Sequence, residues 1–324
     1  MKKSDYAIVV SCTPGYGFGM VSTMAAQNHF GTDADWEIAY DYYTDVQREY
    51  ITSVFPRNVN WTSVKSLIDE YVVDRRTDNS SPLDRMWLSY WLLAHKLLKE
   101  KKYKAVCVIQ ADEFVFVNLD NYFKMAEAGF LVCSEYPFNF YRANELPFGD
   151  DKGVYDRSTA SIFDAINFIG QEHTQLPLDI VNLQCEDSFN GESNHSVIAL
   201  NRAVCRHGKK DKILSLEGRL WVCDSIWAST KLYTVNDKVY NSLAIQLYGW
   251  HCRWWQDGRI AAELNSYKKE DESNPEVMFM RENCEHNYIF TRDFMERFNE
   301  MIPEIKSLYY FKGPIREELN AITA

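Results

Sequence analysis

The most informative part of the sequence is Tyr103-Lys-Ala-Val-Cys-Val-Ile-Gln-Ala-Asp-Glu-Phe-Val-Phe-Val-Asn-Leu-Asp120. Its first part, residues 104–110, is an apolar run of strand length, and the polar residues after it predict where the strand ends. The preceding residues 84–101 have apolar positions at helical spacing and gather lysines at their C-terminal end. A helix followed directly by a buried strand is typical of an α/β domain.

The flanking segments extend the same alternation. We expect further strands at residues 6–13, 36–42 and 71–73, and further helices at 20–30, closed by Gly31, and at 64–70. The sequence therefore predicts an α/β fold with a mixed, mostly parallel, Rossmann-like sheet that helices cover on both faces.

The second half of the chain is less regular. Residues 138–174 are polar and aromatic without clean periodicity, which indicates an insertion or a lid. We expect a strand at 196–200 and strand-like stretches within 232–247.

The composition indicates the cellular location of the protein and the partners that it disfavours. No apolar run approaches the ~20 residues that span a bilayer, and the run at 7–10 is too short for a secretory signal. We therefore expect a cytoplasmic protein without a membrane span, whose eight cysteines are reduced thiols. The net charge of −11 disfavours a general affinity for nucleic acid but leaves room for a local basic groove.

Asp112 follows the strand of the opening stretch directly. In an open α/β sheet, ligands bind beyond the carboxyl ends of the strands. A carboxylate at that place suits a divalent cation held against a diphosphate, because Mg²⁺ and Mn²⁺ prefer oxygen ligands. For Asp120, at the start of the next predicted helix, we expect a turn or capping role instead.

The chain contains, in this order, a tyrosine, a strand, an Asp-x-Asp-like motif (residues 110–112), an apolar run and Asn118-Leu-Asp120. In this order the sequence resembles the glycogenin-like and galactosyltransferase-like enzymes of glycosyltransferase family 8. Three further stretches resemble family motifs in the same order: residues 194–201, 224–228 and 310–316. The resemblance implies one domain of the glycosyltransferase-A (GT-A) type over residues 1–324. Its nucleotide-binding half would be 1–135, and its half for donor sugar and acceptor, with a closing tail, would be 136–324.

The resemblance also implies an activity and a site. The enzyme would move a sugar from a nucleotide-diphosphate sugar, by preference a UDP-sugar, to a hydroxyl of a glycan or a protein. The candidate donor-binding residues are Ser11, Cys12, Thr13, Asp41, Arg85, Gln110, Ala111, Asp112, Asn194, Ser196, Lys312, Gly313 and Arg316. The catalytic candidates are Asp224, Asp187 and Glu186, because a carboxylate can take the proton of the acceptor hydroxyl.

Several of these assignments have ordinary alternatives. Arg85 also fits a surface arginine at a helix start. Glu186 and Asp187 also fit a solvated acidic loop, and the tail with Lys312 and Arg316 also fits a basic turn near a chain end.

Departures from the family pattern leave the role of the metal open. Gln110 stands where the family has its first acid, Tyr310 stands for a histidine and Arg316 for a lysine. With Asp112 as the remaining metal ligand, Mn²⁺ or Mg²⁺ is held mainly through the donor, or basic residues replace it. These departures also fit a catalytically dead module that binds a nucleotide sugar. A further alternative is a phage-type enzyme that glycosylates a hydroxymethylated DNA base.

Overall fold

The computed structural model describes residues 3–13, 17–72, 82–111, 113–115, 118–135, 146–154, 160–187, 196–216, 223–224 and 244–246. Its main feature is a seven-stranded sheet of order β3-β2-β1-β4-β7-β6-β8. The strands are β1 (Tyr6–Cys12), β2 (Asp35–Tyr40), β3 (Val59–Ser63), β4 (Ala105–Ile109), β6 (Leu131–Glu135), β7 (Ile162–Gly170) and β8 (Ile213–Leu216). A second sheet has the order β5 (Glu113–Val115), β10 (Ala244–Gln246) and β9 (Cys223–Asp224).

The seven-stranded sheet is mixed and mostly parallel, as the sequence predicts. β1 pairs in parallel with β2 and β4, so that Val10 lies opposite Ile38 on one side and Ile109 on the other. β7 runs antiparallel between β4 and β6. The sheet therefore has a single reversed strand, and it lies beside β4, which leads into the Asp-x-Asp-like motif.

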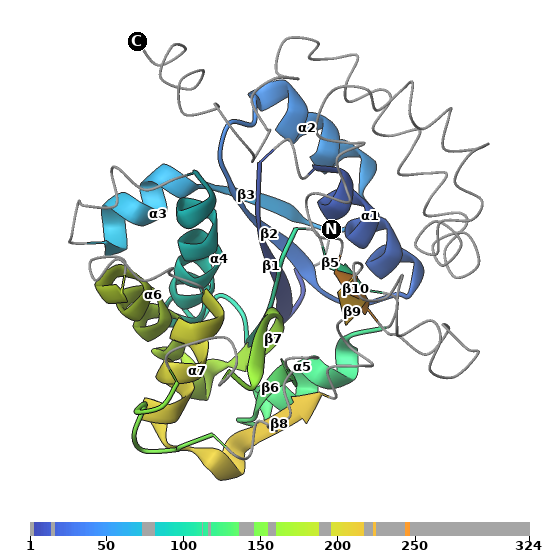
Figure 1. Ribbon diagram of the computed structural model, residues 1–324. Helices are drawn as coiled ribbons and strands as arrows, with labels where there is room; N and C mark the ends of the chain where they lie inside the picture. Colours follow the sequence, from blue (N-terminus) through green and yellow to red (C-terminus); the bar gives the residue numbers. More distant parts are fainter. Residues whose placement is uncertain are drawn as a thin grey trace, which may run out of the picture.

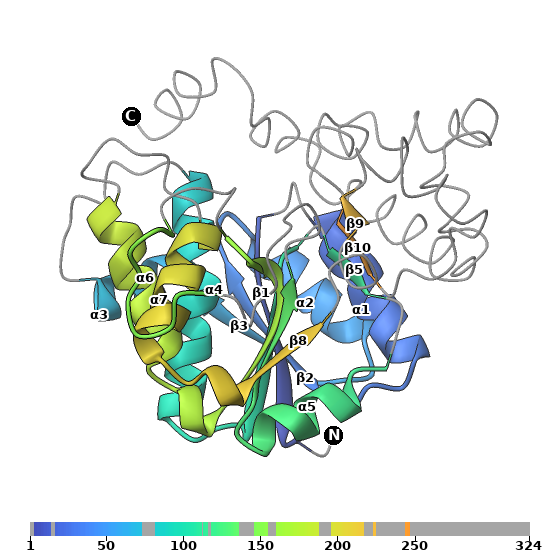
Figure 2. The same ribbon diagram turned by 60° about the horizontal axis from the view of Figure 1, so that its bottom comes forward.

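Helices cover both faces of this sheet (Figures 1 and 2). On one side lie α1 (Gly17–His29), α2 (Asp45–Val54) and α5 (Asp120–Glu127). On the other lie α3 (Val64–Tyr71), α4 (Pro82–Lys99), α6 (Leu176–Asp187) and α7 (Ser196–His207). Each face of the sheet has its own hydrophobic core: the first lies beneath α1, α2 and α5, and the second beneath α3, α4, α6 and α7. Alternate side chains of β1 pack into the two cores, Ile8 and Val10 into the first and Ala7 and Val9 into the second.

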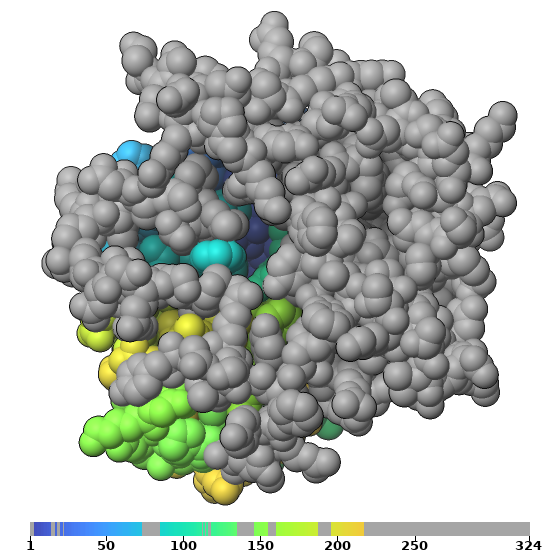
Figure 3. Space-filling view, in the orientation of Figure 1, coloured from blue at the N-terminus to red at the C-terminus, as the bar shows by residue number. Residues whose placement is uncertain are grey.

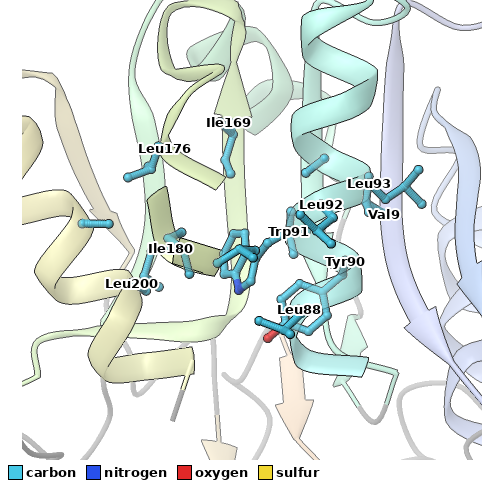
Figure 4. Packing of buried hydrophobic residues seen from close by; sticks show 14 of the residues in the cluster. Val9, Leu88, Tyr90, Trp91, Leu92, Leu93, Ile169, Leu176, Ile180 and Leu200 are labelled. Atoms are coloured by element: carbon cyan, nitrogen blue, oxygen red, sulfur yellow. The ribbon is translucent and has the colours of Figure 1, made fainter. Parts of the chain in front are cut away.

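α4 forms the middle of the second core (Figure 4). Trp91 is fully buried and points from α4 toward Ile180 of α6, with Leu200 of α7 beyond it. Burying an aromatic or aliphatic side chain of this size contributes about 1.5–3 kcal/mol. The helix therefore holds its place by packing, and its N-terminal turn is fixed above the sheet.

Three expectations about secondary structure are wrong. The segment 138–174, expected as an insertion or lid, contains β7, nine consecutive buried residues in the middle of the sheet. Residues 196–200, expected as a strand, begin the helix α7. Residues 71–73 were expected as a strand, but Tyr71 is the last residue of α3 and residue 72 lies outside any strand.

The first two differences have a physical reason. A strand buried on both faces shows no alternation of apolar and polar residues, so its period of two is invisible in the sequence. In α7 the buried residues Val197, Leu200 and Val204 follow helical spacing, but this shows only when residues beyond 200 are included. A short apolar run such as 196–200 fits either structure.

The local backbone geometry explains why two positions are glycines. Gly31 has φ +71° just after α1 and so closes this helix, as predicted. At Gly170, the end of β7, a Cβ atom would lie 2.0 Å from the backbone oxygen of Ala126 in α5. α5 therefore packs against β7 at a distance that only glycine allows.

Residues 146–154 lie against α7 on the outer surface. Asp151 accepts hydrogen bonds from Arg202 (2.8 Å) and Arg206 (3.1 Å), and Gly149 N donates to the carbonyl of Cys205 (2.7 Å). The green and yellow atoms of these two segments adjoin on the surface in Figure 3. Within the described part of the chain, no helix is long and apolar enough to cross a membrane.

Candidate functional site

The carboxyl ends of β1, β2 and β4 meet at one edge of the sheet, which is the candidate site. From β1 the chain proceeds to β2 on one side, whereas β4 pairs with β1 on the other. Ligands of open α/β sheets bind at such a reversal of strand order. Asp41 follows β2, and its N–H donates to the carbonyl of Cys12 at the end of β1 (3.4 Å). Gln110 and Ala111 follow β4 at the same edge.

The polar side chains at the end of β1 differ in whether they have hydrogen-bond partners. Ser11 Oγ lies 2.5 Å from Ser89 Oγ of α4, and Cys12 Sγ lies 3.2 Å from the hydroxyl of Tyr43. Thr13 is 2% exposed, and its Oγ1 makes no hydrogen bond with the residues that the structure describes. A buried polar atom without a partner is costly. Of these three side chains, Thr13 therefore has a hydroxyl that a ligand can satisfy.

Arg85 lies in the first turn of α4 and faces the end of β2. Its Nη2 donates to the hydroxyl of Tyr42 (3.2 Å) and lies 3.7 Å from Oδ2 of Asp41. Burial raises the pKa of the Asp41 carboxyl, and the nearby positive charge of Arg85 partly offsets this. The Arg85 Nε atom is buried and has no hydrogen-bond partner among the described residues. The structure thus brings together two predicted donor-binding residues from separate elements.

Asp164 of β7 is a carboxylate at this edge that the sequence interpretation did not select. It is 3% exposed, and the hydroxyl of Tyr90 on α4 donates to its Oδ2 (3.4 Å). The neighbouring Ala165 accepts a hydrogen bond from Gln110 N (3.1 Å), which places Asp164 beside the end of β4. Its signal in the sequence is a single acid inside an apolar run of strand length, within the segment 138–174 that the sequence predicts to be an insertion or a lid.

Ser196, a predicted donor-binding residue, is the first residue of α7 and belongs to the same buried group. Its Oγ lies at hydrogen-bond distance (3.2 Å) from the hydroxyl of Tyr90, so that Tyr90 connects α4, β7 and α7. Burial and the negative charge of Asp164 hold the pKa of Tyr90 well above its ordinary value. Tyr90 therefore stays protonated and serves as a hydrogen-bond donor to Asp164.

The small sheet brings a second set of residues together. Gln246 of β10 lies opposite Glu113 of β5 and opposite Asp224 of β9, so the three form one row across the sheet. Glu113 directly follows Asp112 in the sequence and is fully buried. The backbone of the catalytic candidate Asp224 thus lies two strands away from the residue after the Asp-x-Asp-like motif.

The remaining candidates have other places. Glu186 lies in the last turn of α6 and is exposed, and Asp187 ends that helix. Asp112, Asn194, Lys312, Gly313 and Arg316 lie outside the described residues.

The described residues contain no group of three or more His, Cys, Asp or Glu side chains placed to hold a metal ion. Because Asp112 lies outside that part of the chain, the cation site stays a prediction. Asp120 is the first residue of α5, and its Oδ1 accepts the N–H of Asp33 (2.8 Å). Asp120 is thus structural, but it does not have the expected turn or capping role: the N-cap of α5 is Leu119, and Asp120 links the helix to residue 33 before β2. The cysteines in the described part of the chain form no disulfide: Cys12, Cys107, Cys133, Cys185 and Cys205.

Comparison with known proteins gives similarity at the level of solved structures. No protein-family model matches the chain, and no curated protein matches it. The galactosyltransferase LgtC, solved in complex with donor and acceptor sugar analogs, is 10% identical, with a TM-score of 0.47. This match covers 75% of this chain and 87% of LgtC. Mouse xyloside xylosyltransferase 1 in its apo form is 9% identical with a TM-score of 0.48, covering 75% of this chain and 97% of that one.

Proposed function

We propose that this chain is a glycosyltransferase that moves a sugar from a nucleotide-diphosphate sugar, by preference a UDP-sugar, to a hydroxyl of a glycan or a protein. The observation that supports this most is the gathering of Thr13, Asp41, Arg85 and Asp164 at the edge where the strand order reverses. The sequence motifs assign the donor to this same edge.

Donor binding is proposed to use the Arg85 guanidinium, the Thr13 hydroxyl and the Asp164 carboxylate at this edge. Arg85 offers a guanidinium whose buried Nε has no partner among the described residues. A guanidinium stays charged and holds two phosphate oxygens at once, which suits a diphosphate. The Thr13 hydroxyl is a second donor or acceptor for the nucleotide. Asp164 is proposed to accept a hydrogen bond from a hydroxyl of the donor sugar.

The transfer step needs positive charge at the leaving diphosphate and a base at the acceptor. Arg85 is proposed to stabilise the departing phosphate oxygens, together with Lys312 and Arg316 from the C-terminal tail. A divalent cation bound at Asp112 would add charge at the same oxygens. Asp224, Glu186 and Asp187 are the proposed candidates for taking the proton of the acceptor hydroxyl.

A thermal-shift panel of nucleoside diphosphates and nucleotide sugars tests the proposal. A ligand at 100 times its dissociation constant should stabilise the fold by about 2.7 kcal/mol. We expect a shift with the uridine series, and no shift with the uridine, guanosine, cytidine or thymidine series would contradict the proposal. Binding without any release of nucleoside diphosphate from the donor would indicate the dead module instead.

The metal proposal has its own test. Asp112→Asn should lose most of the turnover, and EDTA should reduce turnover only in part, since Gln110 replaces an acid of the family pattern. Complete loss with EDTA and full recovery with Mn²⁺ would show that the cation is indispensable despite Gln110.

A further inference from the structure

Tyr42 has an unusual backbone for its residue type. It has φ +62°, a conformation that is uncommon for residues with a bulky side chain. Of the other described residues, leaving glycines aside, Lys101 has a positive φ, and it lies just past the end of α4, where helices often turn this way. Tyr42 follows β2 at the candidate site instead. Such conformations persist where surrounding contacts hold them, frequently at functional sites.

Hydrogen bonds hold both the backbone and the side-chain hydroxyl of Tyr42. Its backbone N–H donates to Oδ1 of Asp41 (3.1 Å), while the backbone N–H of Asp41 donates to Cys12 of β1 (3.4 Å). Its hydroxyl accepts from Nη2 of Arg85 (3.2 Å). The left-handed turn thus joins the end of β2 to the first turn of α4.

Asp41 and Tyr42 converge on the same nitrogen of Arg85. Oδ2 of Asp41 lies 3.7 Å from Nη2, the nitrogen that Tyr42 binds. The Arg85 side chain is 33% exposed, and its buried Nε has no described partner. Holding a long side chain in one orientation before binding removes part of the entropy cost of binding. The two residues leave the Nε–H donor of a pre-oriented guanidinium to a ligand.

We propose that Tyr42 is a positioning residue, which with Asp41 presets the Arg85 guanidinium for the diphosphate of the donor. This inference rests on the proposed function for the identity of the ligand. The backbone conformation of Tyr42 is then part of the device, because it brings the hydroxyl to α4 while the chain continues into α2.

The main test compares binding of UDP and of uridine by titration calorimetry. Tyr42→Phe removes the hydroxyl and keeps the ring, and it should weaken UDP binding on the order of tenfold while leaving uridine binding unchanged. Tyr40→Phe is the matched control, because Tyr40 ends the same strand, whereas Arg85 is contacted by Tyr42 and Asp41. It should leave both affinities unchanged.

A double-mutant cycle separates positioning from general damage. In an Arg85→Ala background, Tyr42→Phe should have no further effect on UDP binding, because the group it orients is gone. Equal weakening of UDP and uridine, an unchanged UDP affinity in Tyr42→Phe, or the same loss with and without Arg85 would overturn the inference.

A second measurement needs no nucleotide. The Arg85 Nε–H group should give a distinct, ordered ¹⁵N resonance in the wild type and in Tyr40→Phe, and Tyr42→Phe should broaden or average it. If the wild type binds no UDP, the proposed function fails and this resonance alone decides the positioning role. An unchanged resonance in Tyr42→Phe would refute it.

Discussion

Asn201 of α7 binds the backbone of Ile162 in both directions. Its Oδ1 accepts the N–H of Ile162 (2.9 Å), and its Nδ2 donates to the carbonyl oxygen of the same residue (2.7 Å). The same Oδ1 also accepts the N–H of Ser161 (2.8 Å). Asn201 is fully buried, so one side chain from a helix fixes the start of β7 two residues before Asp164.

Replacing this side chain should destabilise the fold. Asn201→Ala leaves the buried N–H groups of Ser161 and Ile162 without their acceptor, at a cost of about 1–3 kcal/mol for each such group. We expect the midpoint of urea unfolding to fall accordingly. Asn182→Ala, at an exposed position of α6, should change the free energy of unfolding by less than about 0.5 kcal/mol. Equal effects of the two substitutions would show that Asn201 does not hold β7.

Asp164→Asn should reduce turnover without unfolding the protein. The amide keeps the size of the side chain and an oxygen for the Tyr90 hydroxyl, but it loses the charge. We expect turnover of a nucleotide sugar to fall at least tenfold, about 1.4 kcal/mol in transition-state stabilisation. The exposed substitution Asp211→Asn serves as the control. Full activity in Asp164→Asn would remove this residue from the site.

The Asp41 carboxyl should leave a signature in the pH dependence of stability. Its pKa in the fold is raised by burial, so the folded protein binds this proton more tightly than the unfolded chain does. Its stabilising contribution is therefore complete below the unfolded pKa of about 3.9 and is lost as pH rises through the folded pKa. In the absence of ligand, wild type should lose stability relative to Asp41→Asn over that interval. A constant difference between the two proteins would contradict the shift.

A buried group at the opposite edge of the sheet should affect stability alone. The Tyr103 hydroxyl donates to Oε1 of Glu37 at 2.6 Å, at the start of β2. Burial, and after it the negative charge of Glu37, hold the pKa of Tyr103 far above its ordinary value, so the hydroxyl remains a donor. Tyr103→Phe should lower the free energy of unfolding by about 1.5–3 kcal/mol. The dissociation constant for UDP should not change, and a weakened UDP affinity would show that the two edges are coupled.

The sequence predicts well the elements that have a local signal. β1, β2 and β4 are short apolar runs that end in polar residues, and α4 has a long periodic pattern. Their order alone indicates a parallel, doubly covered sheet. β7 lacks such a signal, because it is buried on both faces and shows no alternation, and nothing local indicates its place between β4 and β6.

The site shows the same division. Asp41 and Arg85 were selected as separate positions at the ends of their elements. That both meet through Tyr42 depends on the turn after β2 and on the placement of α4 over the sheet, neither of which has a local signal. Asp164 is hard to predict for the same reason as β7. In a segment without periodicity, nothing in the sequence indicates that an acidic residue lies in a buried strand.

We propose that a nucleotide-diphosphate sugar is bound and turned over at the carboxyl edge of β1, β2 and β4. The most direct test of this claim is the release of UDP from UDP-sugars, with and without acceptors, in wild type, Arg85→Ala and Tyr103→Phe. We predict slow release in the wild type without acceptor, a loss of at least tenfold in Arg85→Ala, and wild-type rates in folded Tyr103→Phe. No release by the wild type from any nucleotide sugar, or equal rates in wild type and Arg85→Ala, would contradict the claim.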